Sequence, residues 1–273
     1  MLHRCSAKGV PGSGAPFFCQ LLPGCLLAFS LAPVTLADSC AAGHISERVR
    51  VVHVYDGDTV KLEDGRRLRF IGINTPETGH HDQPGQPHAK EAQERVQKLL
   101  ETHNHTLLLQ AGRQQHDHYG RLLAHAFLDD GDNLAVRLLQ EGLATTLVVP
   151  PNTWGQRCYQ RHEDRARRAG LGLWRLDAYK TRQSQALPRD TRGFRIIRGK
   201  VQEVQYSRHN VRLNLEGKLV IHIGKKDIEN FEPGFLDGLQ GQRIETRGWV
   251  RPVKNTLQIK VRHPAALLRI PAV

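Results

Sequence analysis

VYDGDTVKLEDGRRLRFIGINTPE, residues 54–77, predicts two strands joined at Asp64-Gly65. An Asp-Gly pair between two runs rich in β-branched residues is a strong signal for a β-hairpin. With these two residues as the turn, position 60 lies opposite Arg69. Side chains alternate along a strand, so Asp58 and Arg69 then share one face. The hairpin therefore predicts a carboxylate beside a guanidinium without any help from distant sequence.

Further oxygen-bearing groups gather at the ends of this hairpin. They are Asp56, the side chain of Asn74, the backbone carbonyl of Thr75, and Glu77. A hard cation held by oxygen ligands polarises a phosphate, and a carboxylate takes a proton from the attacking water. Arginine binds phosphate oxygens and stabilises their charge. The cluster thus meets the needs of phosphodiester hydrolysis, although Asp-Gly-Asp alone is more often a tight turn with solvated acids.

The rest of the chain predicts a mainly β protein with helices (α+β) in two domains. The first has strands at 48–55, 58–63, 66–73, 106–110 and 121–128, a helix at 87–103, a helix capped by Asn133 and closed by Gly142, and one from Asn152 to about Ala169. After an expected linker at 175–192, the second has strands at 195–206, 210–215, 218–223, 242–250 and 256–262, with a helical segment near 225–231. Five strands with a helix between the third and fourth is the order of an OB-fold. Residues 193–273 are therefore expected to form a small OB-like barrel.

Several motifs together resemble the staphylococcal nuclease family in order and spacing. They are residues 55–60 and 69–77, Ala89-Lys90-Glu91-Ala92, Asp117-His118-Tyr119-Gly120-Arg121-Leu122-Leu123-Ala124, Glu141-Gly142-Leu143-Ala144 and Gly172-Leu173-Trp174. Linked motifs in order are far more specific than any one of them. The resemblance covers about residues 48–174. It implies that residues 38–174 form the family's OB-fold barrel and a catalytic domain.

The resemblance also implies a metal site. Asp58 matches a calcium-ligating aspartate, and Thr75 matches the residue that lends its carbonyl to the metal. Asp56 would lie behind these ligands. Asn74 stands where the best-known member has a second aspartate, and fewer ligand charges weaken metal affinity. The expected cofactor is a divalent cation, with Ca²⁺ the first choice.

The catalytic side chains follow from the same resemblance. Glu77 matches the proposed general base, and Arg69 and Arg121 match two arginines that hold the scissile phosphate. Tyr119 is similar to a tyrosine that contacts the nucleotide. The family's tyrosine pair after Gly-Leu-Ala is absent, because Ala144 is followed by Thr-Thr-Leu-Val-Val-Pro-Pro.

The positive charge belongs to the C-terminal part of the chain. Residues 193–273 hold 15 Lys and Arg against 7 Asp and Glu, whereas residues 38–174 hold 17 against 18. Such a field attracts a polyanion, with nucleic acid the usual one, and Arg198 and Arg212 are candidates for backbone contact. A solvated basic surface or a membrane-surface patch are the alternatives. The aromatic residues Tyr206, Phe231, Phe235 and Trp249 are expected in the core rather than stacked on bases.

The N-terminus predicts export. Residues 1–37 combine basic residues, an apolar run and a small-residue cleavage site, as in a signal peptide; the alternative is a disordered start. Removing them leaves Cys40 and Cys158, which we expect to form a disulfide in an oxidising compartment rather than stay as two thiols. A periplasmic or secreted monomer without stable membrane insertion is predicted, since no later apolar run approaches a bilayer span.

The main hypothesis is an exported, metal-dependent endonuclease that cleaves DNA, RNA or both with little sequence preference. One rival is a catalytically inactive nucleic-acid-binding protein on a nuclease fold, which Asn74 favours. The other is a cell-envelope module whose OB-like domain binds protein or oligosaccharide.

Overall fold

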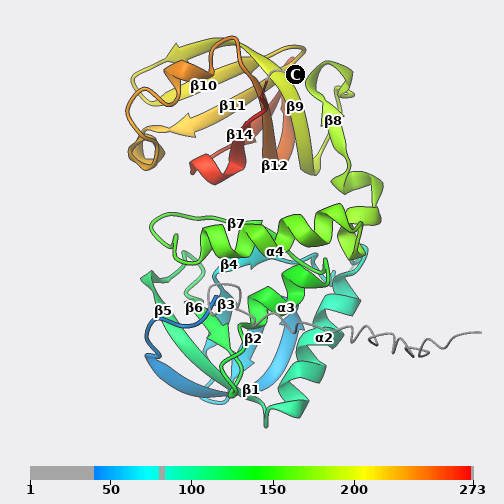
Figure 1. The fold of residues 1–273 in the computed structure, drawn as a ribbon, viewed down its shortest axis with the longest axis vertical. Helices are drawn as coiled ribbons and strands as arrows, with labels where there is room; N and C mark the ends of the chain where they lie inside the picture. Colours follow the sequence, from blue (N-terminus) through cyan, green and yellow to red (C-terminus); the bar gives the residue numbers. More distant parts are fainter. Residues whose placement is uncertain (1–39, 80–83, 272–273) are drawn as a thin grey trace, which may run out of the picture. The chain divides into compact units, whose positions relative to one another are not determined.

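Five strands close the first β-barrel in the computed structural model, which describes residues 40–79 and 84–271. The strands are β1 (Glu47–Asp56), β2 (Thr59–Leu62), β3 (Arg67–Phe70), β5 (Thr106–His116) and β6 (Leu122–Phe127). Their order round the barrel is β1-β2-β3-β6-β5, with β3 and β6 parallel (Figure 1). Helix α2 (Ala89–Thr102) lies between the third and fourth strands in sequence. This is the order of an OB-fold, as predicted.

Alternation along the strands fills this barrel. Val60, Leu62, Leu68 and Phe70 are buried, and α2 covers the core with the apolar stripe that the sequence predicts. The buried residues of that stripe are Ala89, Ala92, Val96, Leu99 and Leu100. One apolar stripe at helical spacing therefore fixes how α2 packs.

The hairpin register differs from the prediction by one residue. Thr59 pairs with Arg69 and Val60 with Leu68. The Leu62 N–H donates to the Arg66 carbonyl at 2.8 Å, so the turn has three residues, Glu63 to Gly65, and not Asp64-Gly65 alone. Asp58 therefore lies opposite Phe70, whose N–H donates to the Asp58 carbonyl at 2.8 Å. Strand alternation is thus the wrong reason for the proximity of Asp58 and Arg69.

The expected strand at 66–73 is also broken in two. Gly72 has φ 91°, and a Cβ there would lie 2.3 Å from the Tyr159 ring. The chain turns away at this glycine and forms β4 (Gly72–Asn74), which pairs with β7 (Thr145–Leu147) outside the barrel. The break carries Asn74 to its place beside Asp58.

Two helices follow the barrel. In α3 (Leu134–Gln140), Asn133 is the predicted cap, and its side chain accepts from the Val136 N–H at 3.2 Å. Helix α4 (Gln156–Arg168) begins after Gly155, so the prediction that Asn152 caps it is wrong. The Asn152 side chain instead bonds both backbone groups of Gln114, each at 2.9 Å. These hydrogen bonds satisfy the backbone N–H and carbonyl of Gln114 at a point of β5 that has no strand partner.

The second barrel repeats the topology of the first. Its strands are β9 (Gly193–Tyr206), β10 (Asn210–Leu215), β11 (Leu219–Gly224), β12 (Arg243–Val253) and β13 (Thr256–Lys260). The order β9-β10-β11-β13-β12 closes through β12–β9, with β11 and β13 parallel. A short 3₁₀ segment, η4 (Lys225–Asn230), stands where the first barrel has α2. Strand β14 (Leu267–Arg269) pairs antiparallel with β12. The predicted second OB-like barrel is present.

The expected linker at 175–192 carries regular structure. Strand β8 (Thr181–Gln183) pairs in parallel with β9, and Ser184 and Thr191 are buried. The segment also holds the 3₁₀ turns η2 (Asp177–Tyr179) and η3 (Ser184–Ala186), and η1 (Gly172–Arg175) runs into its start. Two further 3₁₀ turns, η5 (Asp237–Leu239) and η6 (Pro264–Ala266), belong to the second barrel. Much of the segment therefore packs on the second barrel, although its polar composition is typical of a free connection.

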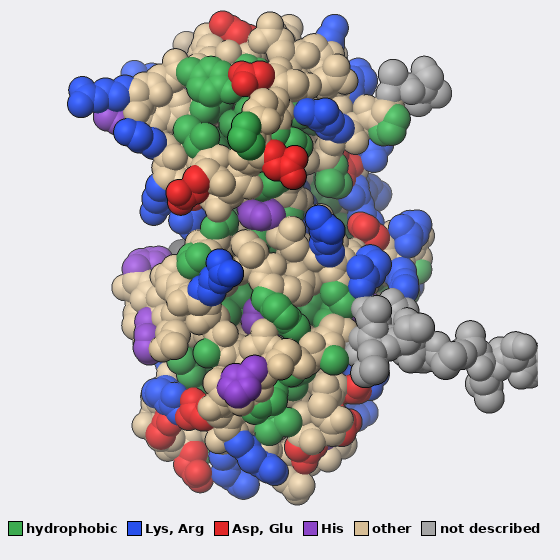
Figure 2. All heavy atoms as spheres, turned by 60° about the vertical axis from the view of Figure 1, so that its left-hand side comes forward, with side chains coloured by type: hydrophobic (Ala, Val, Ile, Leu, Met, Phe, Trp, Pro, Cys, Tyr) green, Lys and Arg blue, Asp and Glu red, His purple; other side chains and the backbone are tan. Residues whose placement is uncertain are grey.

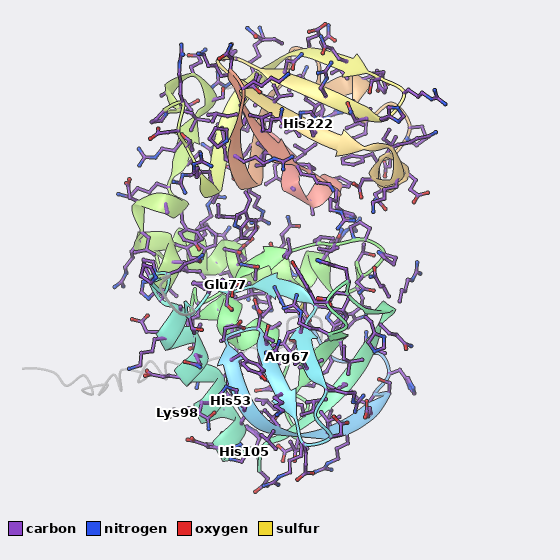
Figure 3. The ribbon with its side chains drawn as sticks, turned by 180° about the vertical axis from the view of Figure 1, so that it is seen from behind. His53, Arg67, Glu77, Lys98, His105 and His222 are labelled. Carbon is purple, nitrogen blue, oxygen red and sulfur yellow. A yellow bond between two sulfur atoms is a disulfide. The ribbon has the colours of Figure 1, made fainter. Side chains whose placement is uncertain are left out.

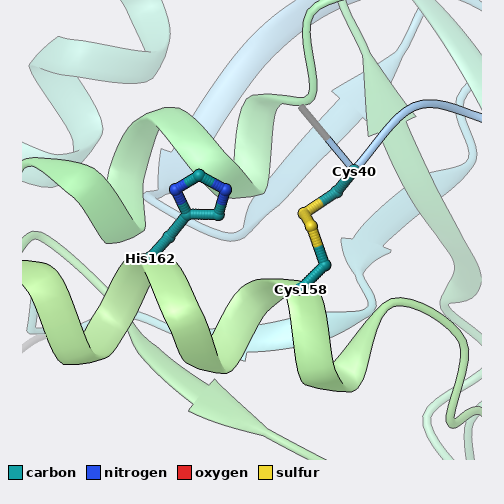
Figure 4. Close-up of side chains that lie close together, drawn as sticks. All are labelled: Cys40, Cys158 and His162. Carbon is teal, nitrogen blue, oxygen red and sulfur yellow. A yellow bond between two sulfur atoms is a disulfide. The ribbon is translucent and has the colours of Figure 1, made fainter. Parts of the chain in front are cut away.

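The predicted disulfide joins Cys40 to Cys158, with a Cα–Cα distance of 5.8 Å (Figure 4). It ties the chain before β1 to α4. The predicted signal at residues 1–37 lies outside the described residues. Within residues 40–79 and 84–271, no helix has the length and apolar character needed to cross a membrane.

Removing this disulfide is expected to lower the free energy of unfolding by about 2–4 kcal/mol, because the bond closes a long loop in the unfolded chain. The sequence separation it spans is 118 residues. Urea unfolding of the Cys40→Ser/Cys158→Ser variant, beside the parent with and without reductant, measures the loss. An unchanged midpoint would contradict a stabilising role.

Candidate active site

The tight turn before β2 sets the position of Asp58. Its N–H donates to the Asp56 carboxylate at 2.9 Å. Gly57 between them has no room for a side chain, because a Cβ would lie 2.7 Å from Thr75 and 2.8 Å from Ala92. The Asp-Gly-Asp tripeptide is therefore a turn, as its composition suggests, but a turn pressed against the chain after β4.

Asp58 is almost fully buried, with its side chain 3% exposed. Its Oδ2 accepts from the Thr75 N–H at 2.8 Å and lies 3.0 Å from Arg69 Nη2. Its Oδ1 accepts from the Thr59 hydroxyl at 3.0 Å. A buried carboxylate with these donors is held in one position. The predicted proximity of Asp58 and Arg69 is real, and the long arginine side chain achieves it across the shifted register.

Arg69 lies at the centre of the cluster. Its Nη1 donates to the carbonyls of Phe70 and Ile73 at 2.7 and 3.0 Å, and its Nη2 to Asn74 Oδ1 at 3.3 Å. The amide nitrogen of Asn74 in turn donates to the Thr75 carbonyl at 2.9 Å. The guanidinium thus bonds the Asp58 and Asn74 oxygens that the sequence assigns to a metal ion.

Three carboxyl groups crowd this region. Burial, together with the charge of Asp58 and a smaller contribution from Glu77, raises the pKa of Asp56 to about 7. Glu77 follows β4 and is exposed, and Figure 3 labels it. The Thr75 hydroxyl is buried without a hydrogen-bond partner among the described residues. Oxygen donors with excess negative charge and an unsatisfied hydroxyl fit a hard divalent cation. Asp58, Asn74 and the Thr75 carbonyl would hold it.

Arg121 reaches the same region from the loop before β6. Its Nε lies 2.7 Å from Asp117 Oδ2, and its guanidinium carbon is 5.5 Å from the centre of the Tyr119 ring. Arg69 and Arg121 line one hollow of about 420 Å³. Tyr119 is 72% exposed. The hollow therefore presents two guanidinium groups, with an aromatic ring beside one of them.

The two arginines predicted to bind substrate in the second barrel lie elsewhere. Arg198 is paired with Glu245, at 2.8 Å between Nε and Oε2, and Glu245 also binds Arg167. Arg212 is exposed on β10. Burial, with the charges of Arg212 and Arg251, lowers the pKa of the neighbouring His222, labelled in Figure 3. Figure 2 shows one face on which basic side chains of this barrel are scattered among acidic ones.

Sequence reasoning missed the contribution of the second barrel to the site. Lys226 and Arg262 line the hollow that holds Arg69 and Arg121. Two of the four aromatic residues expected in the core, Tyr206 and Trp249, are exposed. Tyr206 is the last residue of β9, and alternation along β12 points Trp249 outward. No local pattern could have assigned Lys226 and Arg262 to the site, because packing between distant segments brings them there.

Comparison with known proteins agrees with this geometry. A family model described as staphylococcal nuclease homologue matches residues 67–176. The chain is 36% identical over 131 residues to a thermonuclease of Staphylococcus intermedius, which covers 47% of this chain and 76% of that protein. It is 34% identical over 128 residues to a thermonuclease of Staphylococcus hyicus, covering 46% and 74%. It is 33% identical over 130 residues to endonuclease YncB of Bacillus subtilis, covering 46% and 61%. The family-model match runs from β3 of the first barrel through α4.

Proposed function

The chain belongs to the staphylococcal nuclease family, and from this premise we propose that it is a nuclease that hydrolyses phosphodiester bonds with the help of a divalent cation. The observation that carries the proposal is the contact of Asp58 and Asn74 with Arg69 in one cluster. Arg121 lines the same hollow as Arg69. A binding module would not need buried acid, guanidinium and amide groups to converge on one point.

The side chains divide the chemistry among them. Glu77 accepts a proton from the water that attacks phosphorus, and its exposure leaves it open to that water. Arg69 and Arg121 bind the phosphate oxygens and stabilise the charge that develops in the transition state. A divalent cation, Ca²⁺ by our proposal, supplies polarisation of the phosphate when bound. Tyr119, exposed beside Arg121, contacts the nucleotide.

Cleavage assays test this function. The purified protein is incubated with single-stranded DNA, double-stranded DNA and RNA, with Ca²⁺, with Mg²⁺ and with chelator. We expect cleavage of at least one substrate class at many positions, abolished by chelator. Tight binding without cleavage under either metal would overturn the nuclease and favour the inactive nucleic-acid-binding protein that Asn74 suggests.

Asn74→Asp is expected to lower the metal concentration for half-maximal activity by about tenfold, because an ionised ligand binds a hard cation more strongly than an amide. Metal titrations of the cleavage rate measure it. Asn255→Asp, in the exposed turn between β12 and β13, is the matched control and should leave the titration unchanged. A lower metal concentration for half-maximal activity in both variants would point to a general effect of the added negative charge.

We further propose that the protein is exported to the periplasm or the medium. The Cys40–Cys158 disulfide supports this, because such bonds persist in oxidising compartments. Cell fractionation followed by N-terminal sequencing tests it. A mature chain that begins near residue 38 is expected, and retention of the full chain in the cytoplasm would contradict export.

A further inference from the structure

Trp249 is a large apolar side chain left exposed beside the proposed active site. On β12 it faces outward while its neighbour Val250 faces the core, and it is 47% exposed. The Phe194 ring supports it at 5.3 Å between ring centres, and Tyr179 lies 5.3 Å behind Phe194. The indole is thus fixed from one side by aromatic contacts and open on another.

Trp249 lines the same hollows as Asn74. One of about 240 Å³ and another of about 390 Å³ both include Trp249, Phe194, Asn74 and Thr145. Thr145 pairs with Asn74, and its hydroxyl donates to the Asn74 carbonyl at 3.3 Å. The exposed indole therefore borders the strand that carries a candidate metal ligand.

Basic side chains line both hollows, and Asp177 also lines the larger one. Lys260 and Arg262 line the smaller one, and Arg195 lines the larger one. Arg262 also lines the hollow of Arg69 and Arg121. An apolar indole face among cations suits a base attached to a phosphodiester chain. The base must be unstacked from its partners to reach such a platform, which selects single-stranded nucleic acid.

We propose that Trp249 is a stacking platform for a base of the single-stranded nucleic acid that the nuclease site cleaves. The proposal rests on the proposed function, because it places the base next to Asn74. The second barrel thereby contributes a substrate-binding residue to a site built by the first.

Binding without cleavage tests the platform directly. With chelator present, decathymidylate and an abasic decamer with the same phosphates are titrated against the full protein and against Trp249→Ala and Trp249→Phe. We expect Trp249→Ala to raise the Kd for decathymidylate about tenfold, Trp249→Phe to raise it less, and neither to change the Kd for the abasic strand. Equal Kd values for decathymidylate in all three proteins would overturn the platform. An equal loss on both strands would also overturn it, since that marks a structural change.

Tyr206→Ala is the control, because Tyr206 is exposed at the opposite end of β9 from Phe194. It should leave both affinities unchanged. In cleavage assays with metal, Trp249→Ala should raise KM for decathymidylate about tenfold and leave kcat unchanged. Binding differences in a protein that never cleaves would reject the nuclease and keep the platform. If the protein cleaves and Trp249→Ala has the KM of the parent, the platform is rejected and the nuclease is kept.

Discussion

Glu77→Gln is expected to lower kcat by roughly 100- to 10,000-fold, the range that a positioned general base contributes. Glutamine keeps the shape of the side chain and cannot accept the proton. Glu77 is exposed, so the substitution leaves the core untouched. Single-turnover cleavage at saturating substrate and metal measures the effect on the chemical step.

The matched control is Glu94→Gln on α2. Glu94 is also an exposed glutamate, and it pairs with Lys90 at 3.4 Å. An ordinary surface pair of this kind contributes little, so kcat should be unchanged. Full turnover by the Glu77 variant would mean that another group takes the proton, and the mechanism would be wrong.

The local sequence predicts where the strands lie, but it does not predict the register in which they pair. Both barrels follow from runs of alternating residues and a helix-like segment after the third strand, and these features are short-range. The predicted hairpin register pairs position 60 with Arg69, whereas Thr59 is the partner of Arg69 in the structure, because the turn is longer than the Asp64-Gly65 pair. A shift of one residue reverses every face of a strand. Asp58 still meets Arg69 because arginine is long and Asp58 lies in the turn before β2.

Long-range packing decides the rest of the site. The break at Gly72 depends on the Tyr159 ring, which arrives from α4. Asn152 contacts β5 because unpaired backbone groups of Gln114 lie beside it. Trp249 reaches the neighbourhood of Asn74 only through the packing of the second barrel. These contacts join residues at least 38 positions apart, where a single sequence carries no local signal.

Glu163→Ala is expected to lower the free energy of unfolding by about 3–5 kcal/mol, the cost of removing one partner from a buried ion pair. Glu163 is fully buried. Its carboxylate lies 2.5 Å from Arg247 Nη1 and accepts from the backbone N–H and the hydroxyl of Thr146 at 2.7 and 2.9 Å. Urea unfolding of the purified variant measures the loss.

Arg247→Ala and the double variant complete a mutant cycle. If the pair acts as a unit, the double variant should lose less than the sum of the single losses, because no charge is then left buried alone. Glu94→Ala, at an exposed pair, should change stability by less than about 1 kcal/mol. Additive losses in the cycle would contradict direct coupling between Glu163 and Arg247.

The same pair has a consequence for the proposed metal site. Arg247 belongs to β12 of the second barrel, and Thr146 belongs to β7, which pairs with the strand that carries Asn74. Loss of the Glu163 charge removes a fixed support from β7, so Asn74 is held less firmly. We therefore expect Glu163→Gln, measured under conditions where it remains folded, to raise the metal concentration for half-maximal cleavage several-fold. Loss of a group that bonds a metal ligand directly typically lowers metal affinity by about 10- to 100-fold, and Glu163 acts on Asn74 only through β7. An unchanged metal titration in a variant with reduced stability would mean that β7 holds Asn74 without help from the Glu163 charge.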